Sequence, residues 1–316
     1  MSVIVTGGAG FIGSMLCRLL VERGEDVVVI DNLSNGQKEL IDALGSKVRL
    51  LETDIRDTQA VRKIIKDVHP QGLCHLAAIH FIPYCNKYPL EALDINVQGT
   101  LSVLEACKAT PPEMVVVAST AAVYGICDEP CHETDIPGPL DIYGISKHVC
   151  EQLAWLYSSD TGAPCIAARI FNAVGPNETN LHLVPQLINQ LVRGKRMVSL
   201  GNLEPRRDYI HTSDLSRGLI AALNHKQDGY DVFNIGTGEE HSVRDIVKMC
   251  EVILNQPIKI KQSPLLTRKV DRMHLCANID KIRQVMGWEP KITIQEALRE
   301  LLSTGVEYAV DDVKNA

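Results

Sequence analysis

Near its N-terminus the chain contains Gly7-Gly8-Ala9-Gly10-Phe11-Ile12-Gly13, and this stretch decides the fold. It follows an apolar run at residues 3–5 and precedes residues 12–23, whose apolar side chains recur at helical spacing. A glycine-rich turn between a strand and a helix lets backbone N–H groups approach a pyrophosphate, and the helix start adds partial positive charge. The spacing therefore predicts a dinucleotide site whose contacts are Gly7, Gly10, Phe11, Ile12 and Gly13.

Outward from this turn, short β-branched runs alternate with helical segments. The expected strands are residues 3–5, 27–30, 48–51, 73–76, 114–118 and 165–170, and the expected helices are residues 12–23, 58–68, 92–109 and 143–159. This alternation predicts an α/β fold, a Rossmann-type doubly wound parallel sheet with helices on both faces. After residue 170 the alternation loosens. We therefore expect a cofactor domain at 1–170 and a smaller α/β substrate domain at 171–316, with a late strand at 232–235 returning to the first sheet.

Composition excludes several classes of partner. The chain has 316 residues, of which 45% are hydrophobic, enough to bury a large core. Its net charge of −7 gives no general attraction for nucleic acid or an anionic membrane. No apolar run approaches the roughly 20 residues that a membrane-spanning helix needs. We expect neither a nucleic-acid partner nor a membrane segment, so local arginines must hold any anionic substrate.

The ten cysteines are scattered singly along the chain. Cys127 and Cys131 form the closest pair, and no second pair or histidine ligand set accompanies them. The apolar start lacks the basic segment and long hydrophobic region of a signal peptide. These features predict reduced thiols, a cytoplasmic location and no metal site.

Acidic side chains at strand ends indicate which dinucleotide is bound. Asp31 ends the second predicted strand, where a carboxylate accepts hydrogen bonds from the adenine ribose hydroxyls. It would repel a 2′-phosphate, and no arginine follows nearby to pair with one, so we expect NAD rather than NADP. Further residues at strand ends are expected near the cofactor, although such positions suit a structural role equally well: Asn32, Asp54, Ile55, Leu76, Ala77 and Ala78.

A tyrosine, a lysine and a threonine form the predicted catalytic group. Tyr143 and Lys147 are four residues apart on a predicted helix, so their side chains share one face. A free tyrosine titrates near 10, and an ammonium one turn away favours its phenolate. Lys147 can also hold the nicotinamide ribose. Thr120, near the end of the fifth strand, offers a hydroxyl that orients the substrate oxygen and shares its proton.

Together these strings resemble the extended short-chain dehydrogenases/reductases, specifically the NAD-dependent nucleotide-sugar epimerase/dehydratase family. The resemblance runs nearly end to end. Further matching segments are Ser119–Gly125, Tyr143–Lys147, Asn96–Thr100, Arg169–Pro176, Arg207–His211 with Asp214, Phe233–Gly238 and Gly287–Pro290.

The resemblance implies a nucleoside diphosphate sugar as substrate, bound largely by the C-terminal part. It implies that Asn172, Arg207 and Arg268 contact the diphosphate or nucleoside, a task that suits the arginine fork. Ser119, Thr120 and His80 are expected to border the sugar. The family also implies a homodimer, formed by residues 92–109 and 143–159 packing as a four-helix bundle across a two-fold axis.

Two alanines narrow the reaction within the family. Relatives that eliminate water commonly carry an Asp-Glu pair after the catalytic threonine, and decarboxylating relatives commonly carry a glutamate before Val-Tyr-Gly. Ala121 and Ala122 occupy these positions here, and alanine transfers no proton. The string Ser-Thr-Ala-Ala-Val-Tyr-Gly instead resembles the UDP-sugar 4-epimerases, which work through a transient 4-keto sugar.

Several alternatives stay open. A dehydratase or reductase using another acid is the second enzyme hypothesis, and a catalytically silent protein that binds NAD and nucleotide sugars is the non-enzyme one. Segment 79–85 replaces the small, polar residues usual in the family after the His-x-Ala-Ala string, which indicates an unusual substrate. Leu275 lies near a position that influences tolerance for an N-acetyl group in known epimerases, but its medium size does not distinguish between the candidate sugars. UDP-glucose or galactose, their N-acetyl forms and UDP-glucuronate all remain candidates.

Overall fold

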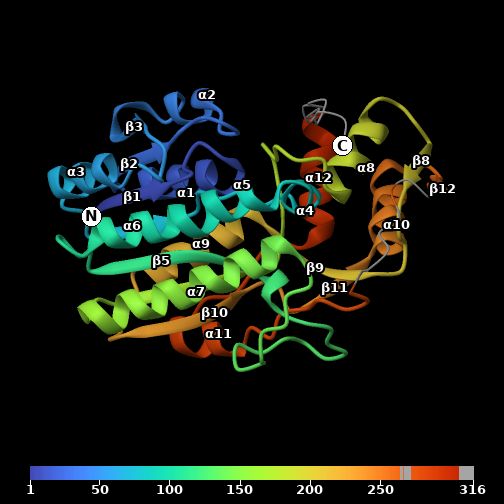
Figure 1. Ribbon diagram of the computed structural model, residues 1–316. Coiled ribbons are helices and arrows are strands. Elements are labelled where there is room, and N and C mark those ends of the chain that lie inside the picture. The colour runs from blue at the N-terminus through green and yellow to red at the C-terminus, as the bar shows by residue number, and fades with distance from the viewer. Residues whose placement is uncertain (264–265, 267–271, 306–316) are drawn as a thin grey trace.

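A seven-stranded parallel sheet forms the centre of the molecule (Figure 1). The computed structural model describes residues 1–263, 266 and 272–305. The strand order is β10-β6-β5-β4-β1-β2-β3. The bounds are β1 Ser2–Thr6, β2 Asp26–Asp31, β3 Val48–Glu52, β4 Gly72–His75, β5 Met114–Thr120, β6 Cys165–Ile170 and β10 Tyr230–Ile235. The predicted α/β fold class with a doubly wound parallel sheet is confirmed.

Helices cover both faces of this sheet. One face carries α1 (Phe11–Glu22) and α9 (Thr212–Leu223), which pack on each other; the other carries α3 (Thr58–Val68), α6 (Gly99–Cys107) and α7 (Ile142–Thr161). Alternate strand residues point to opposite faces, so Val3 and Val5 join the core under α1 while Ile4 joins the core under α3. This two-sided burial explains the unbroken apolar runs of the strands.

Shorter elements connect the main ones. They are α2 (Lys38–Asp42), η1 (Gly45–Lys47), α4 (Ile82–Lys87), α5 (Pro89–Leu93), the π-helical turn η2 (Asp94–Gln98), η3 (Ala121–Val123) and α11 (Asp280–Met286). The segment predicted as one helix at 92–109 is thus built from α5, η2 and α6, which follow one another directly.

A smaller lobe lies beside the carboxyl ends of the sheet strands (Figure 1). It holds a three-stranded sheet of order β11-β9-β7 and a two-stranded sheet of β12 and β8. Its elements are β7 Asn172–Val174, α8 Leu183–Val192, β8 Met197–Leu200, β9 Arg206–His211, β11 Glu240–Ser242, α10 Val243–Leu254, β12 Lys259–Gln262 and α12 Ile294–Thr304. A separate apolar core joins α8, α10 and α12.

The chain after residue 170 contributes to both lobes. Strand β10 pairs in parallel with β6 over Tyr230–Ile235, and α9 packs against α1 on the large sheet. Residues 1–170 therefore do not form the cofactor half by themselves. None of the helices within the described ranges is long and apolar enough to cross a membrane.

Candidate active site

The glycine turn at the end of β1 admits no side chains. Gly7 has a left-handed φ of 70°, and a Cβ there would lie 2.7 Å from the backbone nitrogen of Ala77. A Cβ on Gly13 would lie 2.1 Å from the carbonyl oxygen of Gly7. Gly10 caps α1 without a side-chain hydrogen bond, so the first-turn amides at Phe11 and beyond keep the arrangement that binds a phosphate. This cradle fits the pyrophosphate of a dinucleotide.

Asp31 lies at the end of β2, next to the turn. Its carboxylate accepts hydrogen bonds from the backbone N–H of Ala9 (3.0 Å) and of Leu33 (2.9 Å). Gly36 approaches so closely that a Cβ there would lie 2.9 Å from Asp31 Oδ1. Burial raises the pKa of Asp31, and the two amides oppose that rise. The carboxylate is thus fixed beside the glycine turn, where an adenine ribose would be held.

The third strand ends in an ion-pair cluster. Arg56 donates from Nη2 to Asp54 (2.7 Å) and from Nη1 to Asp94 (2.6 Å), and Asn32 donates to Asp54 (3.2 Å). The hydrogen bonds from Arg56 lower the pKa of Asp54 to about 2. Ile55 is buried directly beneath Gly99. The side chains of Asn32 and Asp54 therefore already have partners within the protein.

The fourth strand ends at a buried histidine that fixes the next loop. His75 lies between the hydroxyls of Thr6 (2.7 Å) and Thr100 (2.9 Å), and burial lowers its pKa to about 3. The following segment, Leu76-Ala77-Ala78, passes over the glycine turn because the amide of Ala77 donates to the Thr6 hydroxyl (3.3 Å). His75 is neutral, and its role is to hold this loop in position.

Tyr143, Thr120 and Lys147 come together between the end of β5 and the first turns of α7. Thr120 hydrogen-bonds the Tyr143 phenol, and Lys147 Nζ donates to the carbonyl of Ala118 at 2.8 Å. Lys147 is 2% exposed, so burial lowers its pKa. The threonine and the lysine are buried, whereas Tyr143 is half-buried, so the three side chains form one group whose tyrosine stays partly accessible.

Burial raises the pKa of Tyr143, and the hydrogen bond from Thr120 opposes the rise. The sequence-based expectation attributed a lowered phenol pKa to Lys147 alone, whereas in the structure the ammonium is engaged with the Ala118 carbonyl. Burial is therefore the main influence on the pKa of Tyr143 in this structure.

Small residues let α7 approach this group closely. A Cβ on Gly144 would lie 2.4 Å from the carbonyl oxygen of Ala122. Asp141 caps the helix by accepting from the Gly144 amide at 2.8 Å. Ala121 and Ala122 are buried in this contact, so no proton-transferring side chain lies at their positions.

Ser119 is hydrogen-bonded inside the protein. Its hydroxyl donates to Glu151 at 2.5 Å, and Glu151 in turn accepts two hydrogen bonds from Arg169. All three side chains are buried. The Ser119 hydroxyl is therefore already bonded within the protein, and its contact with the sugar stays a prediction.

Two of the residues predicted to contact the diphosphate or nucleoside, Asn172 and Arg207, lie on the smaller lobe. Asn172 is exposed at the start of β7, and Arg207 on β9 donates to the carbonyls of Arg206 (2.7 Å) and Arg272 (2.8 Å). Arg268 lies outside the described residues. Arg272, which the sequence did not single out, is 8% exposed and donates to the carbonyls of Ala122, Tyr124 and Gly125.

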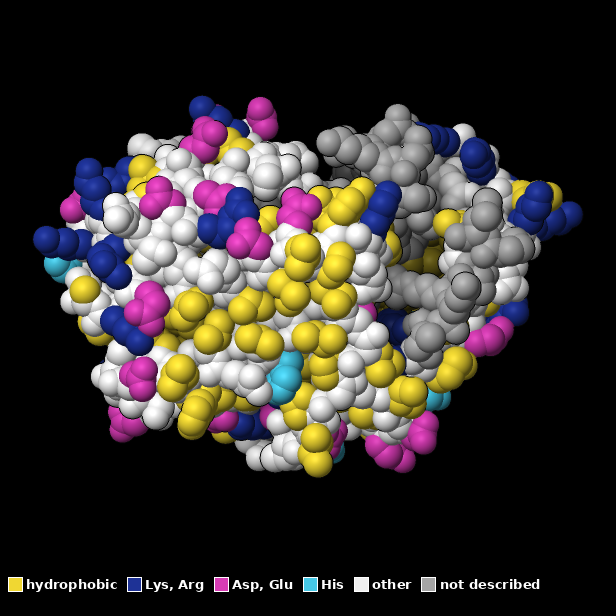
Figure 2. Space-filling model, in the orientation of Figure 1, with side chains coloured by type: hydrophobic (Ala, Val, Ile, Leu, Met, Phe, Trp, Pro, Cys, Tyr) yellow, Lys and Arg dark blue, Asp and Glu magenta, His cyan; other side chains and the backbone are white. Residues whose placement is uncertain are grey.

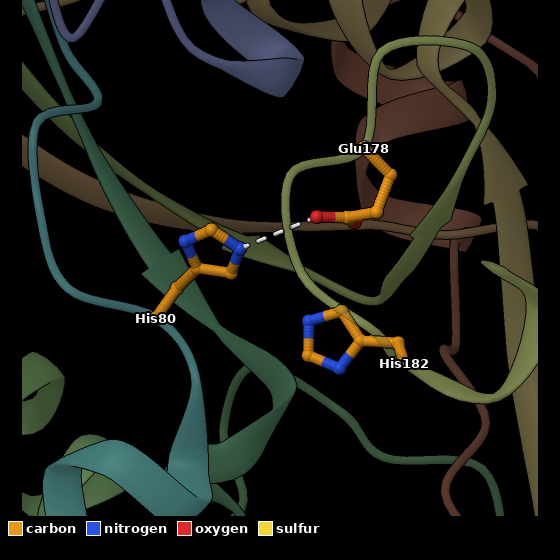
Figure 3. Close-up of side chains that lie close together, drawn as sticks. All are labelled: His80, Glu178 and His182. Carbon is orange, nitrogen blue, oxygen red and sulfur yellow. Dashed lines mark ion pairs between the residues drawn. The ribbon is translucent and has the colours of Figure 1, made fainter. Parts of the chain in front are cut away.

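His80 lies near the mouth of the site, in contact with the loop between β7 and α8. Its Nε2 lies 3.0 Å from Asn180 Nδ2 and 3.8 Å from a carboxylate oxygen of Glu178, and the ring of His182 lies alongside (Figure 3). The sequence analysis named His80 only as a sugar contact and missed Glu178 and His182. No local spacing signals them, because they meet His80 only through the fold.

Comparisons with known proteins agree with the family that the sequence resembles. Residues 4–301 match the family model described as GDP-mannose 4,6 dehydratase. The UDP-glucose 4-epimerase of Corynebacterium glutamicum is 33% identical over 310 residues, covering 93% of this chain and 92% of the relative. The chain therefore belongs to the NAD-dependent epimerase/dehydratase family of extended short-chain dehydrogenases/reductases.

Solved structures extend the likeness to the whole fold. The UDP-glucose 4-epimerase of Thermotoga maritima with UDP-glucose has a TM-score of 0.88 at 29% identity, covering 96% of this chain and 98% of that one. The UDP-glucuronic acid 4-epimerase of Bacillus cereus, in complex with UDP-glucuronic acid and NAD, has a TM-score of 0.88 at 28% identity, covering 96% and 99%. These two proteins act on different sugars.

Proposed function

We propose that the protein is an NAD-dependent UDP-sugar 4-epimerase. One observation carries the proposal: half-buried Tyr143 meets buried Thr120 and Lys147 at the end of β5, with buried alanines where a dehydratase would place its additional acid and base. The Rossmann cradle at Gly7–Gly13 and the fixed carboxylate of Asp31 support NAD as the cofactor.

In the proposed reaction Tyr143 takes the proton of the sugar 4-hydroxyl. Thr120 hydrogen-bonds the phenol and positions it for the transfer. Bound NAD⁺ supplies the acceptor, and later the donor, of the C4 hydride, and its positive ring favours the phenolate. The 4-keto sugar then turns in the site, and Tyr143 returns the proton once the opposite face of C4 has been reduced. No net oxidation occurs.

Each residue of the group has a defined share in this chemistry. The proton transfer itself belongs to Tyr143 and contributes on the order of 10²–10⁴-fold. Lys147, held by the Ala118 carbonyl, is expected to bind the nicotinamide ribose through its remaining N–H groups. Arg207 on β9 is the candidate residue for binding the substrate diphosphate, because a guanidinium can donate two hydrogen bonds to phosphate oxygens.

The sugar is tested with a panel of UDP-sugars. The purified protein with NAD⁺ is incubated separately with UDP-glucose, UDP-N-acetylglucosamine and UDP-glucuronate, and the products are analysed by NMR. We expect a C4 epimer of unchanged mass from at least one sugar and no net NADH. Loss of water or of carbon dioxide from the sugar would assign the chain to another branch of the family. Binding of the sugars without turnover would show that the protein is a catalytically silent binding protein.

We further propose that the protein is a cytoplasmic homodimer. Figure 2 shows hydrophobic side chains gathered over α5, α6 and α7. Four large hydrophobic side chains of α5 and α7 are exposed: Leu90 (84%), Trp155 (56%), Leu156 (46%) and Ile145 (42%). A second copy related by a two-fold axis would bury this surface against itself. All ten cysteines are free, which suits a reducing compartment.

Light scattering tests the dimer at micromolar concentration. Trp155→Glu combined with Leu156→Glu is expected to give a monomer, because it places charges in the apolar interface. Val252→Glu is the matched control, since Val252 is 65% exposed on α10, away from this surface. A monomeric wild-type chain would refute the proposed dimer.

A further inference from the structure

Two histidines and a glutamate from different parts of the chain converge at one point. His80 comes from the loop after β4, whereas Glu178 and His182 come from the segment between β7 and α8 (Figure 3). One possible ligand atom from each side chain lies within 4.8 Å of the other two. Among the described residues, this is the cluster of histidine, cysteine and carboxylate side chains that could hold a metal ion.

The cluster places acceptor atoms against one another. Asn180 donates to Nε2 of His80 (3.0 Å), so this nitrogen presents its lone pair. The carboxylate oxygen of Glu178 that faces it, 3.8 Å away, is also an acceptor. It accepts a hydrogen bond from the backbone N–H of Asn180 at 2.9 Å. Glu178 is only 7% exposed, so bulk water screens its charge poorly. A cation between the two acceptors would satisfy both.

The donor set and its dimensions suit a transition-metal ion. Imidazole and carboxylate ligands lie about 2.0–2.2 Å from Zn²⁺, so neighbouring ligands of a tetrahedral ion are about 3.4 Å apart. The separation of 3.8 Å between His80 and Glu178 is close to that value, and the third ligand needs to approach by about an ångström. The ring centroids of His182 and His80 lie 5.8 Å apart. The ring of Phe81 packs edge-on against His182, with the two centroids 5.4 Å apart.

We propose that His80, Glu178 and His182 bind one divalent transition-metal ion of the Zn²⁺ class. Nε2 of His80 exchanges the Asn180 amide for the ion, and three protein ligands leave at least one coordination position for water or an incoming oxygen ligand. The proposed ion takes no part in the proposed epimerase reaction, and the sequence patterns predicted no metal.

The ion would fasten the smaller lobe to the cofactor half. Glu178 lines a small cavity together with Phe11 of the glycine turn. In the same loop Thr179 accepts a hydrogen bond from Asn35 (3.0 Å). The segment 175–182 thus already touches both the glycine turn and the loop after β2. Metal binding at His80 adds a stronger link across the same junction.

The test measures metal binding directly. The full chain is dialysed against a chelator, saturated with NAD⁺ and titrated with Zn²⁺ by calorimetry. We expect one equivalent per chain and a higher melting temperature with Zn²⁺. His182→Gln and His80→Gln should each weaken binding by about tenfold or more, the loss typical of even indirect disruption of a metal site. His132→Gln is the control, because His132 is an exposed histidine outside the cluster.

A second probe identifies the ligands. Co²⁺ bound by imidazole and carboxylate gives weak visible bands without the intense near-ultraviolet charge-transfer band of thiolate ligation, which separates this site from the cysteines. Melting temperatures in chelator show whether each variant is folded. The proposal is overturned if wild type binds no Zn²⁺ at micromolar concentration, if both folded variants bind it as tightly as wild type, or if Co²⁺ reports thiolates.

Discussion

The two lobes hold their site residues in position by different means. In the cofactor half, close backbone packing fixes the geometry, since neither Gly7 nor Gly13 has room for a Cβ. In the smaller lobe and at its junction, buried charges bond to loop backbone: Asp208 accepts from several amides, and Arg272 donates to several carbonyls. Sequence changes should therefore act mainly on cofactor binding in the first half and on folding in the second.

Removing the Tyr143 hydroxyl is expected to have the largest effect. Tyr143→Phe keeps the ring but removes the group that takes the 4-hydroxyl proton, so turnover should fall by about 10²-fold or more. Binding of NAD⁺ and UDP-sugar should change little. Steady-state kinetics measures the turnover, and calorimetry measures the binding.

Two variants accompany this measurement. Thr120→Ala should reduce turnover less than Tyr143→Phe, because it removes a hydrogen bond to the phenol and not the proton acceptor. Tyr88→Phe, at an exposed tyrosine outside the group, should leave turnover unchanged. Near-normal epimerisation by Tyr143→Phe would rule out the proposed mechanism.

Asp208 tests the claim that buried charge holds the smaller lobe together. Its fully buried carboxylate accepts from the Thr237 amide (2.8 Å) and hydroxyl (2.6 Å), from the Gly238 amide (2.9 Å) and from the Ala277 amide (3.2 Å). Asp208→Asn points an NH₂ donor at these donors. The free energy of unfolding should fall by about 2–3 kcal/mol, measured by urea denaturation.

Asp31→Asn is the matched comparison, because within the described part of the chain the Asp31 carboxylate accepts from two amides. Asp31→Asn should lower the free energy of unfolding by less than Asp208→Asn does. An equal or larger cost for Asp31→Asn would contradict the distinction between the two lobes.

Local patterns predicted the cofactor half well. The strands of the large sheet and all the helices over it except α9 follow from apolar periodicity, and the glycine turn from its own spacing. Tyr143 and Lys147 were predicted to share a helix face, and α7 carries both. In each case the information lies within one or two neighbouring elements of the chain.

Contacts between distant segments were beyond the sequence patterns. Glu178 and His182 meet His80 only because the loop before α8 folds back over the glycine turn. The bonds from Arg272 to the carbonyls of Ala122 and Tyr124 likewise join residues about 150 apart. The bond from the Ser119 hydroxyl to buried Glu151, 32 residues further along the chain, is likewise not signalled by local spacing.

Cofactor choice tests Asp31 in its functional role. NAD⁺ should bind about tenfold or more tightly than NADP⁺, because the Asp31 carboxylate repels a 2′-phosphate. Asp31→Ala should reduce the preference for NAD⁺ over NADP⁺. Asp42→Ala, at an exposed aspartate in α2, should leave that preference unchanged. Calorimetric titration with both cofactors measures the ratio, and equal or tighter NADP⁺ binding would refute the assignment.

The smallest effect is expected from the ion-pair cluster at the end of β3. Arg56 lowers the pKa of Asp54 to about 2 in the folded chain, below the ordinary aspartate value of about 3.9. The unfolded chain therefore takes up this proton first as pH falls, so the stabilisation is complete at neutral pH and is lost between about pH 5 and pH 2. Because the pair is partly exposed, Asp54→Asn should lower the free energy of unfolding by at most about 1 kcal/mol at pH 7. This difference should shrink as the pH falls below about 5. Urea denaturation of both proteins at several pH values measures the difference, with Asp128→Asn, at an exposed aspartate, as the control. A difference that stays constant or grows as pH falls would show that the Arg56 pair is not its source.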